Sequence, residues 1–410
     1  MRAEILSIGT EMLLGQIVDT NANFLAQQLP PLGLDLFYVS EIGDNLSRLS
    51  AAFRQALDRS DVIITSGGLG PTEDDLTREA IAEVLGEHPR VVPELEASLR
   101  EFFARRGRPM PERNVKQATL IPSASVLPNP VGTAPGWWVE HDGKVIASMP
   151  GVPHEMHKMW EEQVQPRLAR RISGGVIISR VLKLIGIGES NAEEIVGDLT
   201  HSINPTLATY AKSDGIHLRL TAKAATPAEA EDLLNAFEPR VRARVAEWVY
   251  GTENDTLPMV VGAMLRERGL KLATAESATG GQLASLITEA PGASDYFVAG
   301  YVAYSADAKR ALGVSPDILE RYGTVAEATT QALAAAARQQ AEADIAVATT
   351  GNAGPGASED KPVGILHVVV DLDGRQVCSE TRYSTTRTEY KRRGALDALY
   401  LLWRELKRGA

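Results

Sequence analysis

The feature that most restricts the fold of this sequence is a repeated alternation of short apolar runs, polar or Gly-rich loops and helix-like segments. In the first 71 residues, the apolar runs are 4–8, 34–40 and 61–66, and the helix-like segments are 21–29 and 47–58. The last of these runs leads into Gly67-Gly68-Leu69-Gly70-Pro71. This order predicts a parallel sheet with helices on its faces. Ligands of such α/β folds lie beyond the carboxyl ends of the strands, where these loops fall.

The rest of the chain predicts two further segments. The segment near 170–250 has expected strands at 180–187 and 217–225, a helix at 190–199 capped by Ser190, and a long helix at 228–248. From residue 251 the alternation returns, with expected strands at 271–275, 296–304, 344–350 and 364–371 and helices at 258–269, 280–288 and 388–406. We therefore expect two three-layer α/β domains, 1–168 and 252–410, joined by a small α+β domain at 169–251.

Composition narrows the function classes. Apolar residues make up 44% of the 410 residues, which is enough for each domain to bury a core. The net charge of -11 repels the negatively charged nucleic-acid backbone, so we expect no direct nucleic-acid binding. The single cysteine, Cys378, excludes an intramolecular disulfide, and neither a signal-peptide core nor an apolar stretch of about 20 residues is evident. These observations predict a cytoplasmic protein that does not insert into membranes, with a homodimer as the default assembly.

A candidate nucleophile follows the expected strand 271–275. Glu276-Ser277-Ala278-Thr279-Gly280-Gly281 lies at a strand-to-helix turn, where main-chain N–H groups can stabilise a developing oxyanion or a phosphate. Gly280 and Gly281 allow a ligand to approach the backbone. Ser277 or Thr279 can also serve only as a helix cap, and the turn by itself favours that interpretation.

Two further loops could complete such a site. Tyr304 and Lys309 follow the apolar run 296–304, and a lysine in a desolvated pocket can be neutral enough to accept a serine proton, although most lysines are solvated surface residues. The loop Thr350–Gly356 follows another apolar run and lacks the Lys-Ser/Thr of a P-loop. It could hold a single phosphate with charge from Arg387. His367 reads as a strand residue.

Together, three motifs of this region resemble the nicotinamide-nucleotide amidohydrolase domain of the competence/damage-inducible CinA family. They are Ala-Glu-Ser-x-Thr-Gly-Gly, Tyr-Ser-x-x-x-Lys and Thr-Gly-x-Ala-Gly-Pro followed by Lys361-Pro362-Val363-Gly364. The resemblance implies that Ser277 attacks the carboxamide of nicotinamide mononucleotide, and that Lys309, assisted by Tyr304, moves its proton to departing ammonia. No cofactor is implied there. The implied substrate-binding residues are Thr279, Gly280, Gly281, Thr350, Gly351, Gly354 and Arg387. Ala278 departs from the family, where a cysteine is common.

Carboxylates cluster near the N-terminal Gly-rich loop. Glu73-Asp74-Asp75 follow it, and Asp44 ends the loop after the second apolar run. Carboxylates beside a Gly-rich turn suit a hard divalent ion that binds phosphates. The same residues also suit an acidic first helical turn that complements the helix dipole. His154 and His157 lack the spacing of a zinc protease.

Residues 1–165 resemble the molybdopterin-binding-like domain found at the front of the same family. The resemblance implies a divalent metal ion (Mg, Mn or Co) at Asp44, Asp74 and Asp75, and hydrolysis of ADP-ribose to AMP and ribose 5-phosphate. Both implied substrates are small nucleotides of pyridine-nucleotide salvage. The alternatives are a domain that only binds a molybdopterin precursor, or a regulatory protein of competence or DNA damage. The middle segment could resemble a KH unit, but the Gly-x-x-Gly loop of such a unit is not evident, since Ile185-Gly186-Ile187-Gly188 has the wrong spacing. We expect a connector or dimer element there.

Overall fold

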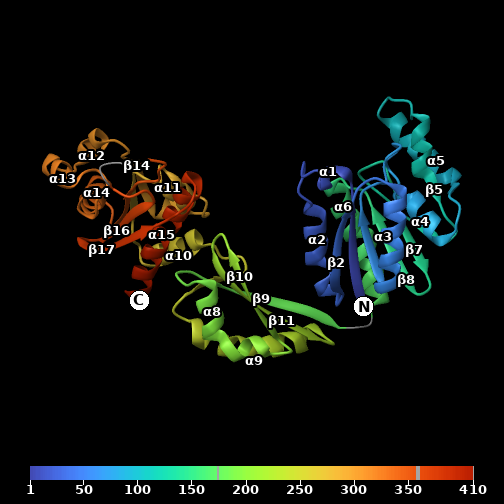
Figure 1. The fold of residues 1–410 in the computed structure, drawn as a ribbon, viewed down its shortest axis with the longest axis horizontal. Coiled ribbons are helices and arrows are strands. Elements are labelled where there is room, and N and C mark those ends of the chain that lie inside the picture. Colours follow the sequence, from blue (N-terminus) through green and yellow to red (C-terminus); the bar gives the residue numbers. More distant parts are fainter. Residues whose placement is uncertain (173–174, 357–360, 410) are drawn as a thin grey trace. The chain divides into compact units, whose positions relative to one another are not determined.

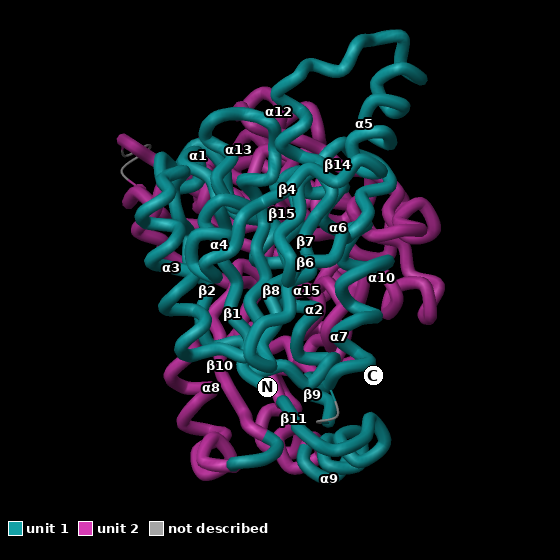
Figure 2. Tube along the Cα trace, turned by 90° about the vertical axis from the view of Figure 1, so that its right-hand side faces the viewer, with its two compact units in different colours: residues 1–179, 203–205, 221–237 teal, residues 180–202, 206–220, 238–410 magenta. Residues whose placement is uncertain are grey.

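The fold was analysed in a computed structural model, which describes residues 1–172, 175–356 and 361–409. The chain divides into two compact units, shown in teal and magenta in Figure 2. Unit 1 contains residues 1–179, 203–205 and 221–237, and unit 2 contains residues 180–202, 206–220 and 238–410. The domain boundaries expected from the sequence, at 169 and 252, stay a prediction.

The N-terminal part, residues 1–172, is built around a six-stranded sheet in the order β2-β1-β3-β8-β7-β6. Its strands are β1 (Arg2–Ile8), β2 (Asp35–Ile42), β3 (Val62–Ser66), β6 (Ala124–Leu127), β7 (Gly136–His141) and β8 (Lys144–Met149), and β4 (Arg90–Val91) pairs with β5 (Thr119–Leu120). Its α-helices are α1 (Thr10–Leu13), α2 (Thr20–Gln28), α3 (Leu46–Arg59), α4 (Thr77–Leu85), α5 (Pro93–Arg105), α6 (Pro153–Met159) and α7 (Gln165–Arg171).

Helices cover both faces of this sheet (Figure 1). Leu25 of α2 and Met156 of α6 are buried with Ile5 and Ile64 on one face. Phe53 of α3 and Ile81 of α4 are buried on the other face with alternate residues of the same strands, such as Leu6 and Ile63. Strands buried on both faces read as continuous apolar runs, which is why β1 and β3 were recognisable in the sequence. The predicted three-layer α/β architecture is confirmed.

The sequence predicts a parallel sheet, but only part of the six-stranded N-terminal sheet is parallel. β1, β2, β3 and β8 are parallel, whereas β7 runs antiparallel to both β8 and β6. The hairpin between β7 and β8 turns at Asp142-Gly143, and both residues have positive φ, 46° and 78°. An Asp-Gly pair at these angles makes a tight two-residue turn, so β8 returns antiparallel beside β7 instead of crossing over.

A small four-stranded sheet follows, in the order β10-β11-β9-β12, and both compact units include residues of it. Its elements are β9 (Val176–Leu184), α8 (Glu189–Val196), β10 (Thr206–Lys212), β11 (Gly215–Ala224), α9 (Pro227–Val245) and β12 (Val249–Thr252). The predicted alternating strand is confirmed as β11. The predicted cap at Ser190 is wrong, because α8 begins one residue earlier behind Gly188 and has no side-chain cap.

Residues 253–409 form a second three-layer structure around the sheet β14-β13-β15-β16-β17. Its strands are β13 (Leu272–Glu276), β14 (Phe297–Val302), β15 (Ile345–Gly351), β16 (Ile365–Leu372) and β17 (Arg375–Arg382). Its helices are α10 (Leu257–Glu267), α11 (Gln282–Thr288), α12 (Ala306–Leu312), α13 (Pro316–Tyr322), α14 (Glu327–Gln340) and α15 (Arg387–Arg408). β13, β14 and β15 are parallel, and β16 and β17 continue the sheet antiparallel.

The core of this part also lies on both faces of its sheet. Apolar residues of α10, α11 and α15 pack on one face, and α14 packs on the other against small residues such as Ala273 and Ala346. The parallel strands β13, β14 and β15 end at the same edge, so the loops that begin at Ser277, Ala303 and Asn352 lie together there. Among the residues that the structure describes, no helix is long and apolar enough to cross a membrane.

Candidate functional site

The loops at the carboxyl edge of the C-terminal sheet bring Ser277 and Lys309 together. Ser277 directly follows β13 and is 8% exposed, and Lys309 lies on α12 and is completely buried. The Lys309 Nζ is 2.9 Å from the Ser277 Oγ. The pairing of β13 with β14, in which Glu276 faces Val302, places these two loops side by side although 32 residues separate them.

Main-chain carbonyls fix the lysine amine further. Lys309 Nζ donates to Ala303 O at 2.8 Å and to Tyr304 O at 3.3 Å. Ser305 caps α12 by accepting from the Ala308 N–H, which holds the start of the helix beside the end of β14. The lysine therefore reaches the serine from a short, anchored helix.

Glu276 is one residue of this site that sequence reasoning missed. It is completely buried, and its carboxylate accepts the N–H groups of Gly281 at 2.9 Å, Leu283 at 3.0 Å and Ala284 at 2.8 Å. Glu276 thus satisfies the first turn of α11, whose N-cap, Gly281, offers no side chain. Neither Ser277 nor Thr279 caps the helix, so the capping interpretation is wrong. The signal in the sequence was an acid at the end of an otherwise apolar strand.

The turn after Ser277 carries three main-chain donors. The Ser277 N–H donates to Thr349 O at 2.9 Å. Within the part of the chain that the structure describes, the N–H groups of Ala278, Thr279 and Gly280 donate to no protein acceptor. The Thr279 hydroxyl is hydrogen-bonded to Thr349 Oγ1 at 2.7 Å, which fixes the turn on the sheet. These N–H groups are therefore available to a negatively charged oxygen beside the serine.

The third loop is tied to the start of α15. Arg387 donates from Nη1 to Gly354 O at 2.8 Å and from Nη2 to the Tyr304 hydroxyl at 2.6 Å. The Tyr304 side chain is 60% exposed, so its phenol lies at the rim of the site and its carbonyl contacts Lys309. The Thr350 hydroxyl is buried against Thr330 Oγ1 at 2.7 Å and therefore holds the loop in place.

A cation that the sequence analysis did not identify, Lys391, lies one helical turn after Arg387. Lys391 is close to the serine turn, since a Cβ added at Gly280 would be 3.4 Å from its Nζ. Residues four apart lie on the same face of a helix, so Arg387 and Lys391 present two cations near the N-terminus of α15. With the helix dipole, this arrangement suits a phosphate.

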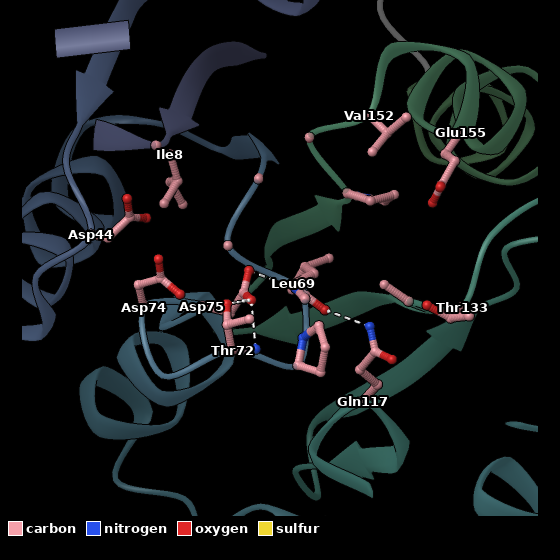
Figure 3. Close-up of a pocket in the computed structure, with 18 of the residues that line it drawn as sticks. Ile8, Asp44, Leu69, Thr72, Asp74, Asp75, Gln117, Thr133, Val152 and Glu155 are labelled. Atoms are coloured by element: carbon pink, nitrogen blue, oxygen red, sulfur yellow. Dashed lines mark hydrogen bonds between the residues drawn. The ribbon is translucent and has the colours of Figure 1, made fainter. Parts of the chain in front are cut away.

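A cavity of about 490 Å³ lies at the carboxyl edge of the N-terminal sheet. Its walls come mainly from the loops after β1, β2, β3 and β8, including Asp44 and Gly67–Pro71, and Glu155 of α6 also lines it (Figure 3). The buried Arg78, also missed in the sequence, ties the Gly-rich loop to the segment before β7 by donating to Leu69 O and to Pro135 O, each at 2.8 Å. Its burial lowers the pKa of its guanidinium to about 10.

The three predicted metal ligands line this cavity but have different surroundings. Asp44 Oδ2 accepts from the Thr10 N–H and hydroxyl, both at 2.8 Å. Asp75 accepts from Gly70 N at 2.7 Å and Thr72 N at 2.9 Å, so both its oxygens hold the loop together. A hydrogen bond from Thr72 lowers the pKa of Asp74 and keeps it anionic. Figure 3 shows Asp44 and Asp74 on the same side of the cavity.

The carboxylates of this cavity suit a metal ion that is held by only one or two protein ligands. No group of three or more His, Cys, Asp and Glu side chains could hold a metal ion among residues 1–172, 175–356 and 361–409. Mg²⁺ commonly keeps several waters and uses one or two carboxylates together with substrate phosphates. Asp44 and Asp74 fit that arrangement, whereas the loop-bonded Asp75 fits it less well.

Comparison with known proteins agrees with this architecture. Family models match residues 4–170 as a probable molybdopterin binding domain, residues 179–251 as the damage-inducible protein CinA KH domain, and residues 254–406 as the CinA C-terminal domain. The suspected KH resemblance of the middle segment is therefore confirmed.

Whole-length relatives show the same organisation. A Moorella thermoacetica protein that carries the name competence-damage inducible protein is 47% identical over 99% of both chains. A CinA-like protein of Thermomicrobium roseum is 42% identical over 98% of this chain and 96% of its own. A crystal structure of CinA from Thermoplasma acidophilum is 34% identical and covers 40% of this chain and 98% of its own, with a TM-score of 0.38. Since the Moorella and Thermomicrobium matches run through all three segments, the chain belongs to the CinA family.

Proposed function

We propose that the C-terminal site hydrolyses the carboxamide of nicotinamide mononucleotide to give nicotinate mononucleotide and ammonia. The observation that carries this proposal is the 2.9 Å contact between Ser277 Oγ and the Nζ of the completely buried Lys309. Burial disfavours the charged form of an amine. The carbonyls of Ala303 and Tyr304 can only accept, so a neutral amine that donates both hydrogens to them directs its lone pair at the Ser277 hydroxyl.

The reaction then follows from these positions. Ser277 Oγ forms a bond with the carboxamide carbon while Lys309 takes the serine proton. The N–H groups of Ala278, Thr279 and Gly280, which have no acceptor among the described residues, would stabilise the negative oxygen that develops. Lys309 returns the proton to the nitrogen as the C–N bond breaks. Water hydrolyses the remaining ester, with Lys309 as its base, and Ser277 regains its proton. The cations Arg387 and Lys391 hold the 5′-phosphate.

Ammonia release from nicotinamide mononucleotide tests this proposal. We expect Ser277→Ala and Lys309→Met each to lower kcat by at least about a thousandfold. The matched control is Ser285→Ala, which removes an exposed serine from α11. Thermal unfolding of each variant reports whether it folds. Retained activity in folded Ser277→Ala would exclude Ser277 as the nucleophile.

We further propose that the N-terminal cavity hydrolyses a nucleoside diphosphate sugar such as ADP-ribose. The observation that supports it is a cavity of about 490 Å³ in which Asp44 and Asp74 face a Gly-rich loop. Asp44 and Asp74 would hold a divalent ion, which when bound neutralises a diphosphate and acidifies a water. The Gly-rich loop lines the cavity, and Arg78 keeps that loop in place by donating to Leu69 O.

Release of AMP from ADP-ribose in the presence of Mg²⁺, Mn²⁺ or Co²⁺ tests this second activity. Asp74→Asn removes a carboxylate from the cavity and should abolish the metal-dependent rate. Glu73→Gln is the matched control, because Glu73 is exposed, adjacent in sequence and outside the cavity. If the wild type releases no AMP with any of these ions, the domain is not this hydrolase, and binding of a molybdopterin precursor becomes the better proposal.

A further inference from the structure

The middle segment contacts the helix that carries Arg387 and Lys391. The turn between β10 and β11 lies against the start of α15, where Arg392 Nη1 donates to Ser213 O at 2.6 Å. Both partners belong to unit 2. Arg392 directly follows Lys391, so this contact falls beside the two cations proposed above to hold the 5′-phosphate. The amide hydrolysis proposed there uses no residue of the middle segment.

Two further contacts with the middle segment follow along α15. Gly186 is packed so closely on Tyr400 that a Cβ there would collide with the phenol. Lys407 Nζ donates to Ala246 O at 2.8 Å. Arg392, Tyr400 and Lys407 are eight and seven residues apart, close to two turns of an α-helix, so they lie along one side of α15. The middle segment therefore supports this helix from its first turns to its last.

Arg387 and Lys391 lie on the other side of the same helix. At about 100° per residue, Lys391 is about 180° around the helix axis from Tyr400, and Arg387 is about 140° from it. That side also carries apolar residues of the core that packs on the C-terminal sheet, among them Ala398 and Leu402. α15 is therefore held between the sheet and the middle segment, and a shift of its first turns moves both cations.

The turn that meets α15 is itself fixed by the residue after Ser213. The Asp214 carboxylate accepts from the Tyr250 hydroxyl at 3.0 Å and lies 2.9 Å from His217 Nε2. Lys183 Nζ lies 3.6 Å from the same carboxylate. These three partners come from β12, β11 and β9. Since three strands hold the turn, the Ser213 carbonyl offers α15 an acceptor at a defined position.

The guanidinium of Arg392 is oriented on its own helix. Its Nε and Nη2 donate to the two carboxylate oxygens of Glu389 at 2.9 and 2.7 Å, and a bidentate pair of this kind fixes the plane of the guanidinium. Nη1 then points to Ser213 O. Arg393 also donates to Glu389, at 2.8 Å, but within the described part of the chain it has no hydrogen bond to the middle segment. The two arginines therefore differ in their contact with the β10–β11 turn.

We propose that Arg392 is a positioning residue of the C-terminal site, which joins the β10–β11 turn to α15 and thereby sets the positions of Arg387 and Lys391. This proposal rests on the amide hydrolysis proposed above, and it gives the middle segment a role in binding the substrate phosphate. Because the contact acts through the two cations, it affects the binding of a substrate that carries a phosphate and leaves the chemistry at Ser277 unchanged.

The test compares ammonia release from two substrates by the full-length protein. Nicotinamide mononucleotide carries the phosphate, and nicotinamide riboside lacks it. We expect Arg392→Ala to raise KM for the mononucleotide about tenfold, as loss of one charge-assisted hydrogen bond predicts, with kcat unchanged and no change for the riboside. Arg392→Lys still carries a donor for Ser213 O and should restore part of the loss. Arg393→Ala is the matched control and should behave as the wild type.

A second variant separates position from charge. Asp214→Ala removes a negative charge, so electrostatics alone predicts tighter binding of a phosphate and a lower KM for the mononucleotide. Loss of support for the turn predicts a higher KM instead. Thermal unfolding of each variant reports whether it folds. An unchanged or lower KM in folded Asp214→Ala, or an equal change for both substrates in Arg392→Ala, would overturn the positioning role while the amide hydrolysis stands.

A binding measurement covers failure of the hydrolysis itself. If the wild type hydrolyses only the mononucleotide, or neither compound, calorimetric titration with ribose 5-phosphate decides the positioning role. A Kd about tenfold weaker in Arg392→Ala, but not in Arg393→Ala, then supports it. Equal Kd values in these variants and the wild type, or no binding by the wild type, overturn it.

Discussion

At the scale of single residues, the C-terminal site depends on two buried side chains, one that contacts the serine and one that holds the following helix in place. Lys309 places its amine against Ser277, and Glu276 uses its carboxylate to hold three N–H groups of the following helix. Glu276 thereby relieves Ser277 and Thr279 of capping α11. Because a buried carboxylate is costly unless it is fully hydrogen-bonded, this residue also makes the turn rigid.

Substitution of Glu276 by glutamine tests that role. Glutamine replaces one acceptor oxygen with an NH₂ group that faces main-chain donors, so at least one buried N–H loses its partner. We expect a loss of about 1–3 kcal/mol in the free energy of unfolding and a lower kcat for ammonia release. Chemical denaturation and kinetics measure both. Glu289→Gln, at the exposed end of the same helix, should change neither.

His367 should make the stability of the folded protein depend on pH. Its burial in β16 lowers the pKa of its imidazole below 6.5, although Glu380 opposes that shift. Below pH 6.5 the unfolded chain therefore binds a proton that the folded chain resists, and stability falls as the pH falls. The thermal midpoint should drop between pH 7 and pH 5 by less in His367→Gln than in the wild type. An equal drop in both would contradict this, and exposed His88→Gln should behave as the wild type.

At the scale of elements, the turns after the strands shape both sites. The turn after β3 is the clearest case, because Gly67 has a φ of 105° and a Cβ there would collide with the main-chain oxygen of Ile8. Gly67 therefore lets the Gly-rich loop pass directly over the end of β1. That close approach brings the loop to the same cavity as Asp44.

A pair of glycine substitutions separates backbone conformation from close packing. Gly86 also has a positive φ, 68°, but a Cβ there would meet nothing within 4 Å. We expect Gly86→Ala to cost only about 1–2 kcal/mol for its left-handed backbone. Gly67→Ala should cost about 2–5 kcal/mol, because the collision with β1 adds to that strain, and it should impair AMP release. Similar unfolding midpoints for the two variants would show that the close approach does not matter.

At the scale of the whole molecule, each candidate site lies inside one compact unit (Figure 2). Asp44, Asp74 and the Gly-rich loop belong to unit 1, and Ser277, Lys309 and Arg387 belong to unit 2. Membership of the CinA family is shown along the full length of the chain. The two proposed activities therefore need no residue from each other's unit.

Removal of divalent metal should separate the two activities. With EDTA, AMP release from ADP-ribose should stop and return when Mg²⁺ is added, while ammonia release should continue because the Ser277–Lys309 chemistry uses only protein groups. Asp74→Asn should likewise leave ammonia release intact, and Ser277→Ala should leave AMP release intact. Loss of ammonia release in EDTA would contradict a metal-free serine mechanism.

The sequence by itself determined the layers and the positions of the loops. Strands such as β3 and β15 are buried on both faces, so their local apolar runs were sufficient to identify them. The hairpins of the antiparallel strands carried a local signal as well, Asp142-Gly143 and Asp373-Gly374, which was overlooked. These features depend on neighbours in the chain, and the sequence records them directly.

Only the tertiary structure decided which side chains meet. The parallel pairing of β13 with β14 brings Ser277 to Lys309, and no local pattern encodes a register between strands that are far apart in sequence. The same holds for Glu276, whose partners lie on the next helix, and for Arg392, whose partner Ser213 lies in the middle segment. Hydrogen-bond partners and burial are properties of packed neighbours, so they exist only once the chain has folded.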